Sequence, residues 1–374
     1  MSRSTGGRSN PRPKWLPFVA GGLALLLAGA VVFGLSHQGG LSVAAPDVAT
    51  GQAAPEFAGI TDWENSKPLT MASLKGKVVL IDFWTYSCIN CQRTFPYLRQ
   101  WHRTYGSQGL VIVGVHSPEF DFEKDVGNIR EAIKHYGVEW PVAVDPAMAT
   151  WSAWSNQYWP AEYLVDKNGN VVHSHFGEGE YDKTEQEIRT LLAAAGHTVG
   201  PAGTASIDPG VSADAQAQTA ELYASAARTY NIPAAVPDRV NTYVDPGADA
   251  GGHRQNNKIY WNGSWKIGQE FAEHARDSPP GQDYFLVDYQ ARQVHIVAQG
   301  GAGVARAYLT LDGADLKPTD AGPEVKFDGD GHAYVDVDRS DLYTLVKAAG
   351  FGHHVLKISP TTPGFRLFTF TFGS

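Results

Sequence analysis

The amino-acid sequence predicts an α/β domain followed by an all-β, jelly-roll-like sandwich, with a single transmembrane helix at the N-terminus. No Asp, Glu, Lys or Arg occurs from Trp15 to Pro46. Apolar runs then alternate with helical patterns, which is typical of α/β proteins. Beyond residue 220 short apolar runs dominate, as in β-sandwiches. We therefore expect a cytoplasmic N-terminus (1–14), a transmembrane anchor (15–36), an α/β domain (50–197), a linker (198–219) and a β-sandwich (220–374).

The composition is that of a globular protein. Of the 374 residues 43% are hydrophobic and 18% are charged, so a packed core is expected and wholesale disorder is not. The formal net charge is −9. A nucleic-acid partner is not expected, because such proteins present a basic face to the phosphates.

The N-terminal segment has the pattern of a membrane anchor. Residues 1–14 carry Arg and Lys and no acidic residue, and the apolar centre runs from Leu16 to Leu35. At ~1.5 Å per residue this centre spans a hydrocarbon layer of about 30 Å. The basic flank predicts a cytoplasmic N-terminus, with the rest outside the cytoplasm. The alternative is a cleaved signal peptide ending near Ser42–Ala45, although the apolar run is long for one.

The α/β domain is predicted from runs of apolar residues and their periodicity. Val78–Trp84 is a nearly continuous apolar run and is expected to be a buried central strand. A helix follows Cys88, with apolar residues at three- to four-residue intervals up to Tyr105. The remaining elements are expected to be strands at Leu110–His116 and Val142–Val144, a helix at Asp125–Tyr136, a hairpin of Tyr163–Asp166 with Val171–Phe176, and a helix at Glu185–Ala195.

The C-terminal half is predicted to contain about eight short strands. Examples are Lys258–Trp261, Tyr284–Tyr289 and Phe365–Phe372. Asn262-Gly and Asp312-Gly are turn signals that separate such runs. Leu342–Ala349 is predicted as one short helix or helical turn.

Only two cysteines are present, Cys88 and Cys91, three positions apart. One disulfide across so short a loop cannot act as a folding scaffold. A tetrahedral zinc site needs more Cys or His ligands than this pair supplies, so no metal is expected, and no cofactor either. The remaining interpretation is that the two cysteines form a redox-active pair. The alternative is that they are two unrelated buried cysteines.

The position of the pair fits thiol–disulfide exchange. It lies just past a strand, on the first turn of a helix, where free N–H groups and the helix dipole favour a thiolate. Cys88 is therefore predicted to be the attacking thiolate, and Cys91, one turn on, to resolve the mixed disulfide.

Residues 54–192 resemble the extracytoplasmic TlpA/ResA and DipZ-type branch of the thioredoxin-like superfamily. The resemblance rests on Ala54–Phe57, Leu74–Trp84, Cys88-Ile-Asn-Cys91 with Pro96, Val113–Glu119 and Trp159–Asp166. It implies that Pro160 is the family's cis-proline, whereas the base rate alone favours trans. Ser87 and Trp159 depart from the family pattern, which puts substrate choice in doubt. Because the chain has one predicted span, the resemblance implies an electron donor that is a separate multi-span membrane protein.

The C-terminal half is similar to the last domain of DipZ-type proteins, which is itself similar to carbohydrate-binding modules. The resemblance makes a glycan a candidate ligand, on an aromatic platform of Tyr260, Trp261, Trp265 and Tyr289. Core packing is the favoured role for most of these side chains.

Further site residues are weaker candidates. Trp84, Tyr86, Trp159 and Pro160 are candidates for substrate contact, with a packed aromatic wall as the alternative for Trp84 and Tyr86. Glu119 and Glu162 are candidates for proton transfer to Cys91, with ordinary surface carboxylates as the alternative. His116 is expected to be structural.

The function predicted from these features is reduction of disulfides in envelope proteins. The alternatives are a peroxidase-like redoxin, disfavoured by the residues before Cys88, and an envelope binding protein that acts through its β-domain. The direction of electron flow stays open, because the same CxxC geometry serves reductants and oxidants.

Overall fold

The computed structural model describes residues 51–200, 202, 217–228, 237–248 and 254–373. These residues belong to one compact unit, Pro46–Ser374. The predicted N-terminus (1–14) and anchor (15–36) lie outside the described residues. Within the described ranges, no helix is both long and apolar enough to cross a bilayer.

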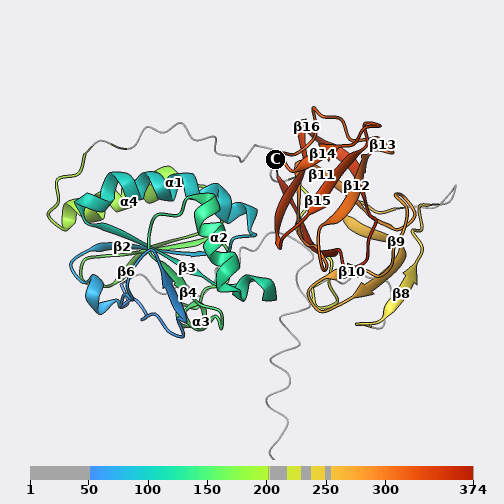
Figure 1. Cartoon of the computed structure of the whole chain (residues 1–374). Coiled ribbons are helices and arrows are strands. Elements are labelled where there is room, and N and C mark those ends of the chain that lie inside the picture. The colour runs from blue at the N-terminus through green and yellow to red at the C-terminus, as the bar shows by residue number, and fades with distance from the viewer. Residues whose placement is uncertain (1–50, 201, 203–216, 229–236, 249–253, 374) are drawn as a thin grey trace, which may run out of the picture. The chain divides into compact units, whose positions relative to one another are not determined.

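Residues 51–200 form a mixed sheet of six strands, in the order β1-β4-β3-β2-β5-β6 (Figure 1). Strands β2, β3 and β4 pair in parallel, and β1, β5 and β6 pair antiparallel to their neighbours. The central strand β2 is buried at every position, as its apolar run predicts. The strands are β1 (Asp62–Glu64), β2 (Val78–Trp84), β3 (Leu110–His116), β4 (Val142–Val144), β5 (Ala161–Val165) and β6 (Val171–Phe176).

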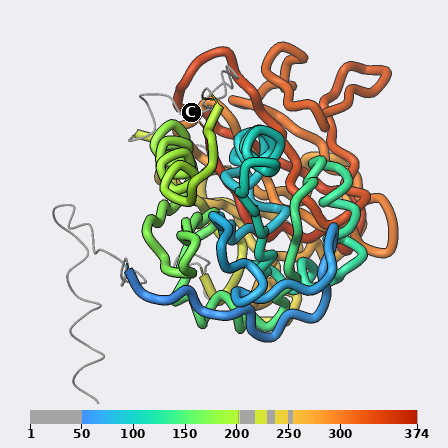
Figure 2. Tube along the Cα trace, turned by 90° about the vertical axis from the view of Figure 1, so that its left-hand side faces the viewer, coloured from blue at the N-terminus to red at the C-terminus, as the bar shows by residue number. Residues whose placement is uncertain are grey.

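Helices cover both faces of this sheet. Figure 1 shows α1 and α4 on one side and α3 on the other, and Figure 2 shows α1 and α4 side by side, viewed nearly end-on. The rings of Tyr97 in α1 and Tyr181 in α4 stack 3.6 Å apart. The helices are α1 (Ile89–Tyr105), α2 (Val126–Tyr136), α3 (Ala149–Ala153) and α4 (Tyr181–Ala194), with short 3-10 turns at η1 (Ala72–Leu74), η2 (Gly106–Gln108) and η3 (Asp121–Lys124).

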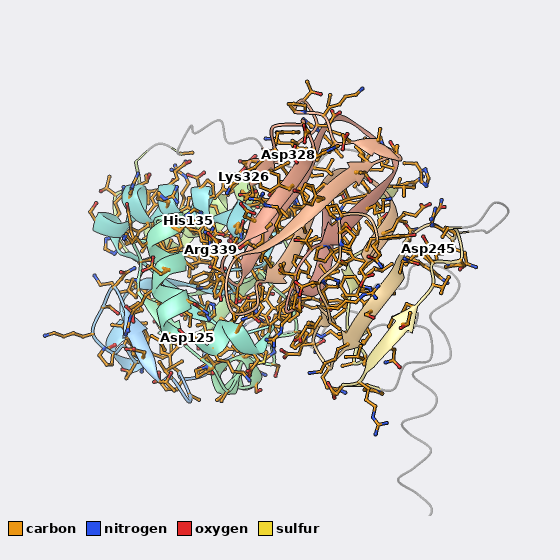
Figure 3. All side chains as sticks on the ribbon, turned by 45° about the vertical axis from the view of Figure 1, so that its right-hand side comes forward. Asp125, His135, Asp245, Lys326, Asp328 and Arg339 are labelled. Carbon is orange, nitrogen blue, oxygen red and sulfur yellow. The ribbon has the colours of Figure 1, made fainter. Side chains whose placement is uncertain are left out.

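The ends of α2 follow ordinary capping chemistry. The Asp125 carboxylate accepts the backbone N–H of Asn128 at 3.1 Å, and Gly137 ends the helix in the left-handed region at φ 61°. Asp125 and His135, labelled in Figure 3, lie near its two ends. The helix thus occupies the predicted range, with Asp125 as its cap.

The alternation of β2 sends its side chains into two separate cores. Val78, Leu80 and Trp84 pack on the face that also holds Cys91 and residues of α1, α2 and α4. Val79, Ile81 and Phe83 pack on the opposite face, with the tryptophans of the α3 region. Because the period is two, Asp82 belongs to the Cys91 face.

The C-terminal region is all-β, as predicted. Its strands join into one hydrogen-bonded sheet of eleven, through the long strands β11 and β16, which pair along most of their length. The strands are β7 (Leu222–Tyr223), β8 (Val240–Tyr243), β9 (Lys258–Ile267), β10 (Ala272–His274), β11 (Tyr284–Gln299), β12 (Ala305–Leu311), β13 (Ala314–Asp315), β14 (Val325–Phe327), β15 (Ala333–Val337), β16 (Asp341–Pro360) and β17 (Arg366–Gly373).

Two local predictions for this region are wrong. Leu342–Ala349 is part of β16, where tertiary pairing with β11 decides the conformation. Asn262-Gly does not end a strand, because it lies inside β9. Gly263 has φ +95°, and a Cβ there would lie 2.2 Å from the Asp283 carboxyl carbon. Glycine is therefore needed because the Asp283 side chain packs directly on the backbone, and not because the chain forms a hairpin turn. Asp312-Gly does turn the chain, between β12 and β13.

Smaller differences concern short or irregular elements of the α/β part. Strand β1 and helix α3 were not predicted, because elements of three and five residues carry too little periodicity. Helix α4 begins at Tyr181, four residues before the predicted start at Glu185. The stacking of Tyr181 on Tyr97 stabilises this extra turn.

Replacing Leu164 by Ala should destabilise the protein by about 2–5 kcal/mol, because a fully buried side chain of β5 would leave a cavity. Urea unfolding followed by circular dichroism measures this. Val304→Ala is the control, since Val304 is 60% exposed and its loss should change stability by less than about 0.5 kcal/mol. Equal effects of the two substitutions would contradict the assignment of Leu164 to the core.

Candidate active site

The two cysteines lie where β2 passes into α1. Cys88 is the N-cap of α1, with extended φ and ψ of −84° and 115°, and its sulfur accepts the backbone N–H of Cys91 at 3.4 Å. Cys88 is half-buried, Cys91 is fully buried, and both are free thiols. The helix N-terminus thus presents one sulfur to the surface and keeps the other in the core.

The segment before β5 lies against the Cys88 sulfur. The Trp159–Pro160 peptide bond is cis. The family resemblance implies a cis bond at this position, whereas the base rate of X–Pro bonds alone favours trans. The Cys88 Sγ is 4.0 Å from the Trp159 carbonyl oxygen. The Trp159 indole donates to the Ser117 carbonyl at 2.9 Å and packs 4.2 Å from the Trp151 ring. These contacts hold a backbone edge beside the exposed thiol.

Two carboxyl groups lie in the core on the Cys91 side of the sheet. Asp82 in β2 and Glu162 in β5 are cross-strand partners, so their side chains share a face. Burial, and then the charge of Glu162, raise the pKa of Asp82 well above its usual value. Burial also raises the pKa of Glu162 to about 7, although the Thr184 hydroxyl opposes the shift.

The buried thiol of Cys91 also has a raised pKa. Burial raises the pKa of the Cys91 thiol, the hydrogen bond to Cys88 and its charge raise it further, and the charge of Asp82 adds to the effect. Sequence reasoning singled out Glu162 and missed Asp82. The signal was present, because an acid inside the apolar run Val78–Trp84 is costly to bury and therefore informative.

Glu119 lies elsewhere in the site. Its carboxylate accepts from Arg228 at 2.6 Å and from the Tyr223 hydroxyl at 2.7 Å. It lines a cavity of about 230 Å³ that Cys88 also lines and Cys91 does not. The hydrogen-bond partners of the Glu119 carboxylate thus lie in the C-terminal domain, and proton transfer from Glu119 to Cys91 stays a prediction.

A carboxylate that sequence reasoning missed holds the loop before Cys88. Glu123 is fully buried and accepts from the Ser87 hydroxyl at 2.6 Å and from the backbone N–H groups of Glu119 and Phe120 at 2.6 and 2.9 Å. Burial, and then the charge of Glu119, raise its pKa to about 7. No local pattern distinguishes it from a surface glutamate, because its side-chain partner Ser87 lies 36 residues away.

The structure buries Trp84 and Tyr86, and their predicted contact with substrate stays a prediction. Their side chains are 0% and 2% exposed and form the aromatic wall beneath the active-site loop. The Trp84 ring packs 5.3 Å from Phe95, and the Tyr86 ring stacks 5.7 Å from His116. Burial lowers the pKa of His116 to about 3, which fits its predicted structural role as a neutral ring.

Metal chemistry finds no support in the part of the chain that the structure describes. No group of three or more His, Cys, Asp or Glu residues is placed there to hold an ion. The chemistry available at this site is that of two thiols and a buried carboxyl pair.

The unfolding free energy should fall as pH rises from about 4.5 to about 7. Over this range the unfolded chain releases the Glu162 proton, which the folded protein retains because of its raised pKa of about 7. The contribution is about 3 kcal/mol, and Glu162→Gln should remove it and make the profile less steep, while other carboxyl groups with raised pKa values, such as Glu123, keep part of the slope. Urea unfolding at several pH values measures this. The exposed Glu131→Gln is the control, and equal slopes in the wild type and Glu162→Gln would contradict the assignment.

Comparisons with known proteins agree with this geometry. Two family models match the chain, Redoxin over residues 49–192 and the Thioredoxin like C-terminal domain over residues 219–373. Protein DipZ of Mycobacterium tuberculosis is 35% identical over 327 residues, which cover 86% of this chain and 43% of that protein. The chain thus spans less than half the length of DipZ.

Two shorter relatives match the first domain. Thiol-disulfide oxidoreductase YkuV of Bacillus subtilis is 31% identical over 38% of this chain and 95% of its own length. Thiol-disulfide oxidoreductase ResA of Bacillus thuringiensis is 28% identical over 45% of this chain and 92% of its own length. The chain therefore belongs to the thioredoxin-like superfamily of thiol–disulfide oxidoreductases, as a relative of DipZ, ResA and YkuV in which an all-β C-terminal domain follows the redoxin domain.

Proposed function

We propose that this protein is an extracytoplasmic thiol–disulfide oxidoreductase that reduces disulfides in envelope proteins. The observation that carries the proposal is the asymmetry of the cysteine pair. Cys88 is accessible at the N-terminus of α1 beside the cis Trp159–Pro160 bond, and Cys91 is buried behind it. The names of ResA and YkuV describe thiol–disulfide oxidoreductases, which supports the reaction type of the proposal.

The proposed reaction has two exchange steps. The Cys88 thiolate attacks one sulfur of the substrate disulfide, a mixed disulfide forms, and the other substrate sulfur leaves as a thiolate that takes up a proton. The Cys91 thiolate then attacks the Cys88 sulfur and releases the second substrate thiolate. The substrate gains two electrons, and the protein is left with a Cys88–Cys91 disulfide.

The second step requires the buried Cys91 thiol to lose its proton. Asp82 is the group proposed to accept it, since its charge contributes to the raised pKa of Cys91 and burial raises its own pKa toward that of a thiol. Glu162, its cross-strand partner, is proposed to tune this acceptor.

The proposed location rests on the sequence. Residues 1–14 would stay in the cytoplasm, residues 15–36 would span the membrane, and the redox domain (50–197), the linker (198–219) and the C-terminal domain (220–374) would lie outside. A separate multi-span membrane protein would return the Cys88–Cys91 pair to the dithiol. Disulfides persist as substrates outside the cytoplasm, which makes such a reductant useful there.

Glycan binding by the C-terminal domain, which we propose to be a jelly-roll-like sandwich, receives no support from the expected platform. Trp261, Trp265 and Tyr289 are 3%, 0% and 0% exposed and pack in the β-sheet core. Tyr260 is half-buried, and its hydroxyl contacts the Gln255 backbone. Sugar-ring stacking needs exposed aromatic faces, so this alternative is not favoured.

The reduction potential of the Cys88–Cys91 couple is expected near −270 mV, the thioredoxin end of the known range. Equilibration of the full chain in defined thiol buffers, with quantification of the two redox forms, measures it. Cys88→Ser should abolish disulfide reduction, and Cys91→Ser should accumulate mixed disulfides. A potential near −120 mV would mean that the protein donates disulfides, and the proposed direction would be wrong.

Asp82→Asn should slow the second step at least about tenfold at neutral pH, because the buried proton acceptor is lost. This rate is measured from the decay of a mixed disulfide, sampled by rapid quenching between pH 6 and 9. The pH at which the step reaches half of its maximal rate should rise in the variant. The control is the first step, measured in a Cys91→Ser background, which should change less than about twofold. Equal slowing of both steps would contradict the role of Asp82.

A further inference from the structure

The cavity beside Cys88 has walls from both domains. One side is formed by the active-site loop and the segment that precedes Pro160, including Cys88 and Trp159. The other side is formed by residues of the C-terminal domain, namely Glu221, Tyr223, Val297 and Thr371. The cavity volume is about 230 Å³, which admits a narrow segment and not the face of a folded domain.

An apolar contact fixes the second wall. Phe120 and Phe122 follow β3, and their rings lie 5.0 and 4.8 Å from the ring of Phe368 in β17. Phe120, Phe368, Val297 and Leu342 form one buried cluster. The wall is therefore held by removal of aromatic surface from water.

Polar contacts join the same two segments. Arg228 forms an ion pair with Glu119 at 2.6 Å, and its guanidinium lies 4.8 Å from the centre of the Tyr223 ring. The Tyr223 hydroxyl donates to Glu119 at 2.7 Å. The charge of Glu119 is thus matched by a cation at the rim of the cavity.

The other carboxylate of the cavity is not matched in this way. Glu221 accepts hydroxyl hydrogen bonds from Thr369 and Thr371 at 3.1 and 3.2 Å, and it lies 3.0 Å from the Tyr223 hydroxyl, whose single proton goes to Glu119 at the shorter distance. Among the described residues, no ion pair joins Glu221 to a Lys, Arg or His. Hydroxyl groups orient the carboxylate without neutralising it, so negative charge remains in the wall opposite Cys88.

We propose that the C-terminal domain forms a substrate-selecting wall of the redox site, in which Glu221 favours disulfides that carry a positive charge close to the sulfur atoms. The substrate class is a disulfide on a narrow, extended segment with a neighbouring lysine, arginine or amine. This inference rests on the proposed function, because it concerns the substrate of the same exchange reaction. Glu221 touches the substrate but takes no part in bond making.

The test uses three small disulfides that differ in charge and undergo the same chemistry. Cystamine carries two ammonium groups, 2-hydroxyethyl disulfide is neutral, and 3,3′-dithiodipropionate carries two carboxylates. Each is reduced to two thiols as the full-length protein dithiol becomes the Cys88–Cys91 disulfide. Partial removal from water, and then the charge of Glu119, raise the pKa of Glu221 to about 7, so the assay is run at pH 8, where Glu221 is ionised.

Second-order rate constants are measured by stopped flow, and their cystamine-to-dithiodipropionate ratio is compared between variants. Glu221→Gln should lower this ratio about fivefold or more, as expected for loss of one nearby charge, and Glu221→Lys should lower it further. The rate with 2-hydroxyethyl disulfide should change by a smaller factor than the rate with either charged probe, and it reveals any general effect of the substitution on the site. Thr371→Lys, which places a cation beside Glu221, should shift the ratio in the same direction.

Asp330→Asn is the matched control, because Asp330 is an exposed carboxylate of the same domain that does not line the cavity. Its ratio should equal that of the wild type. A wild-type protein that reduces none of the three probes would refute the proposed function itself. Reduction of all three probes, with an unchanged ratio in folded Glu221→Gln, Glu221→Lys and Thr371→Lys, would overturn the selecting role of the wall alone.

Discussion

The passage of the buried strand β2 into helix α1 is the constraint on which the site depends. Every residue of β2 is buried, so the strand cannot shift without exposing one of two cores. Its end fixes where α1 begins, and the first turn of α1 then sets the two sulfurs apart. Cys88 caps the helix at the surface, and Cys91 lies below it on the face that carries Asp82. Because the two cysteines are three residues apart at the start of one helix, one sulfur lies at the surface and the other lies in the core.

This placement explains how two identical thiols take different roles. In the core, low polarity disfavours every charged form, so it raises the pKa values of Cys91, Asp82 and Glu162 together. The buried carboxyl group and the buried thiol therefore both hold their protons more tightly than they would in water. Cys88, by contrast, meets the N–H of Cys91 at the open end of the helix. The division of labour thus follows from depth and from position at the helix end, with no difference in side-chain chemistry.

Local sequence was sufficient to predict an element where one pattern, such as an unbroken apolar run, determined its environment. The strands Val78–Trp84 and Leu110–His116 match their predicted ranges, because an unbroken apolar run has one stable environment in an α/β fold. Prediction failed where partners came from far along the chain. Leu342–Ala349 became a strand through pairing with β11, and Gly263 serves the close approach of Asp283. Glu123 could not be recognised, because its partner Ser87 lies 36 residues away. Asp82 could have been recognised from the sequence, because an acidic residue within an apolar run indicates a buried functional group.

The segment between β3 and α2 connects the redox pair with the C-terminal domain. Glu123 holds the hydroxyl of Ser87, the residue before Cys88, and also the backbone of Glu119 and Phe120. Glu119 in turn binds Arg228, and Phe120 packs on Phe368. One short segment therefore contacts the active-site loop on one side and the C-terminal domain on the other. Glu123 itself bonds only within the redox domain, and Glu119 and Phe120, whose backbone it holds, make the contacts to the C-terminal domain. The cavity shape and the position of the reactive sulfur are consequently set by the same few contacts.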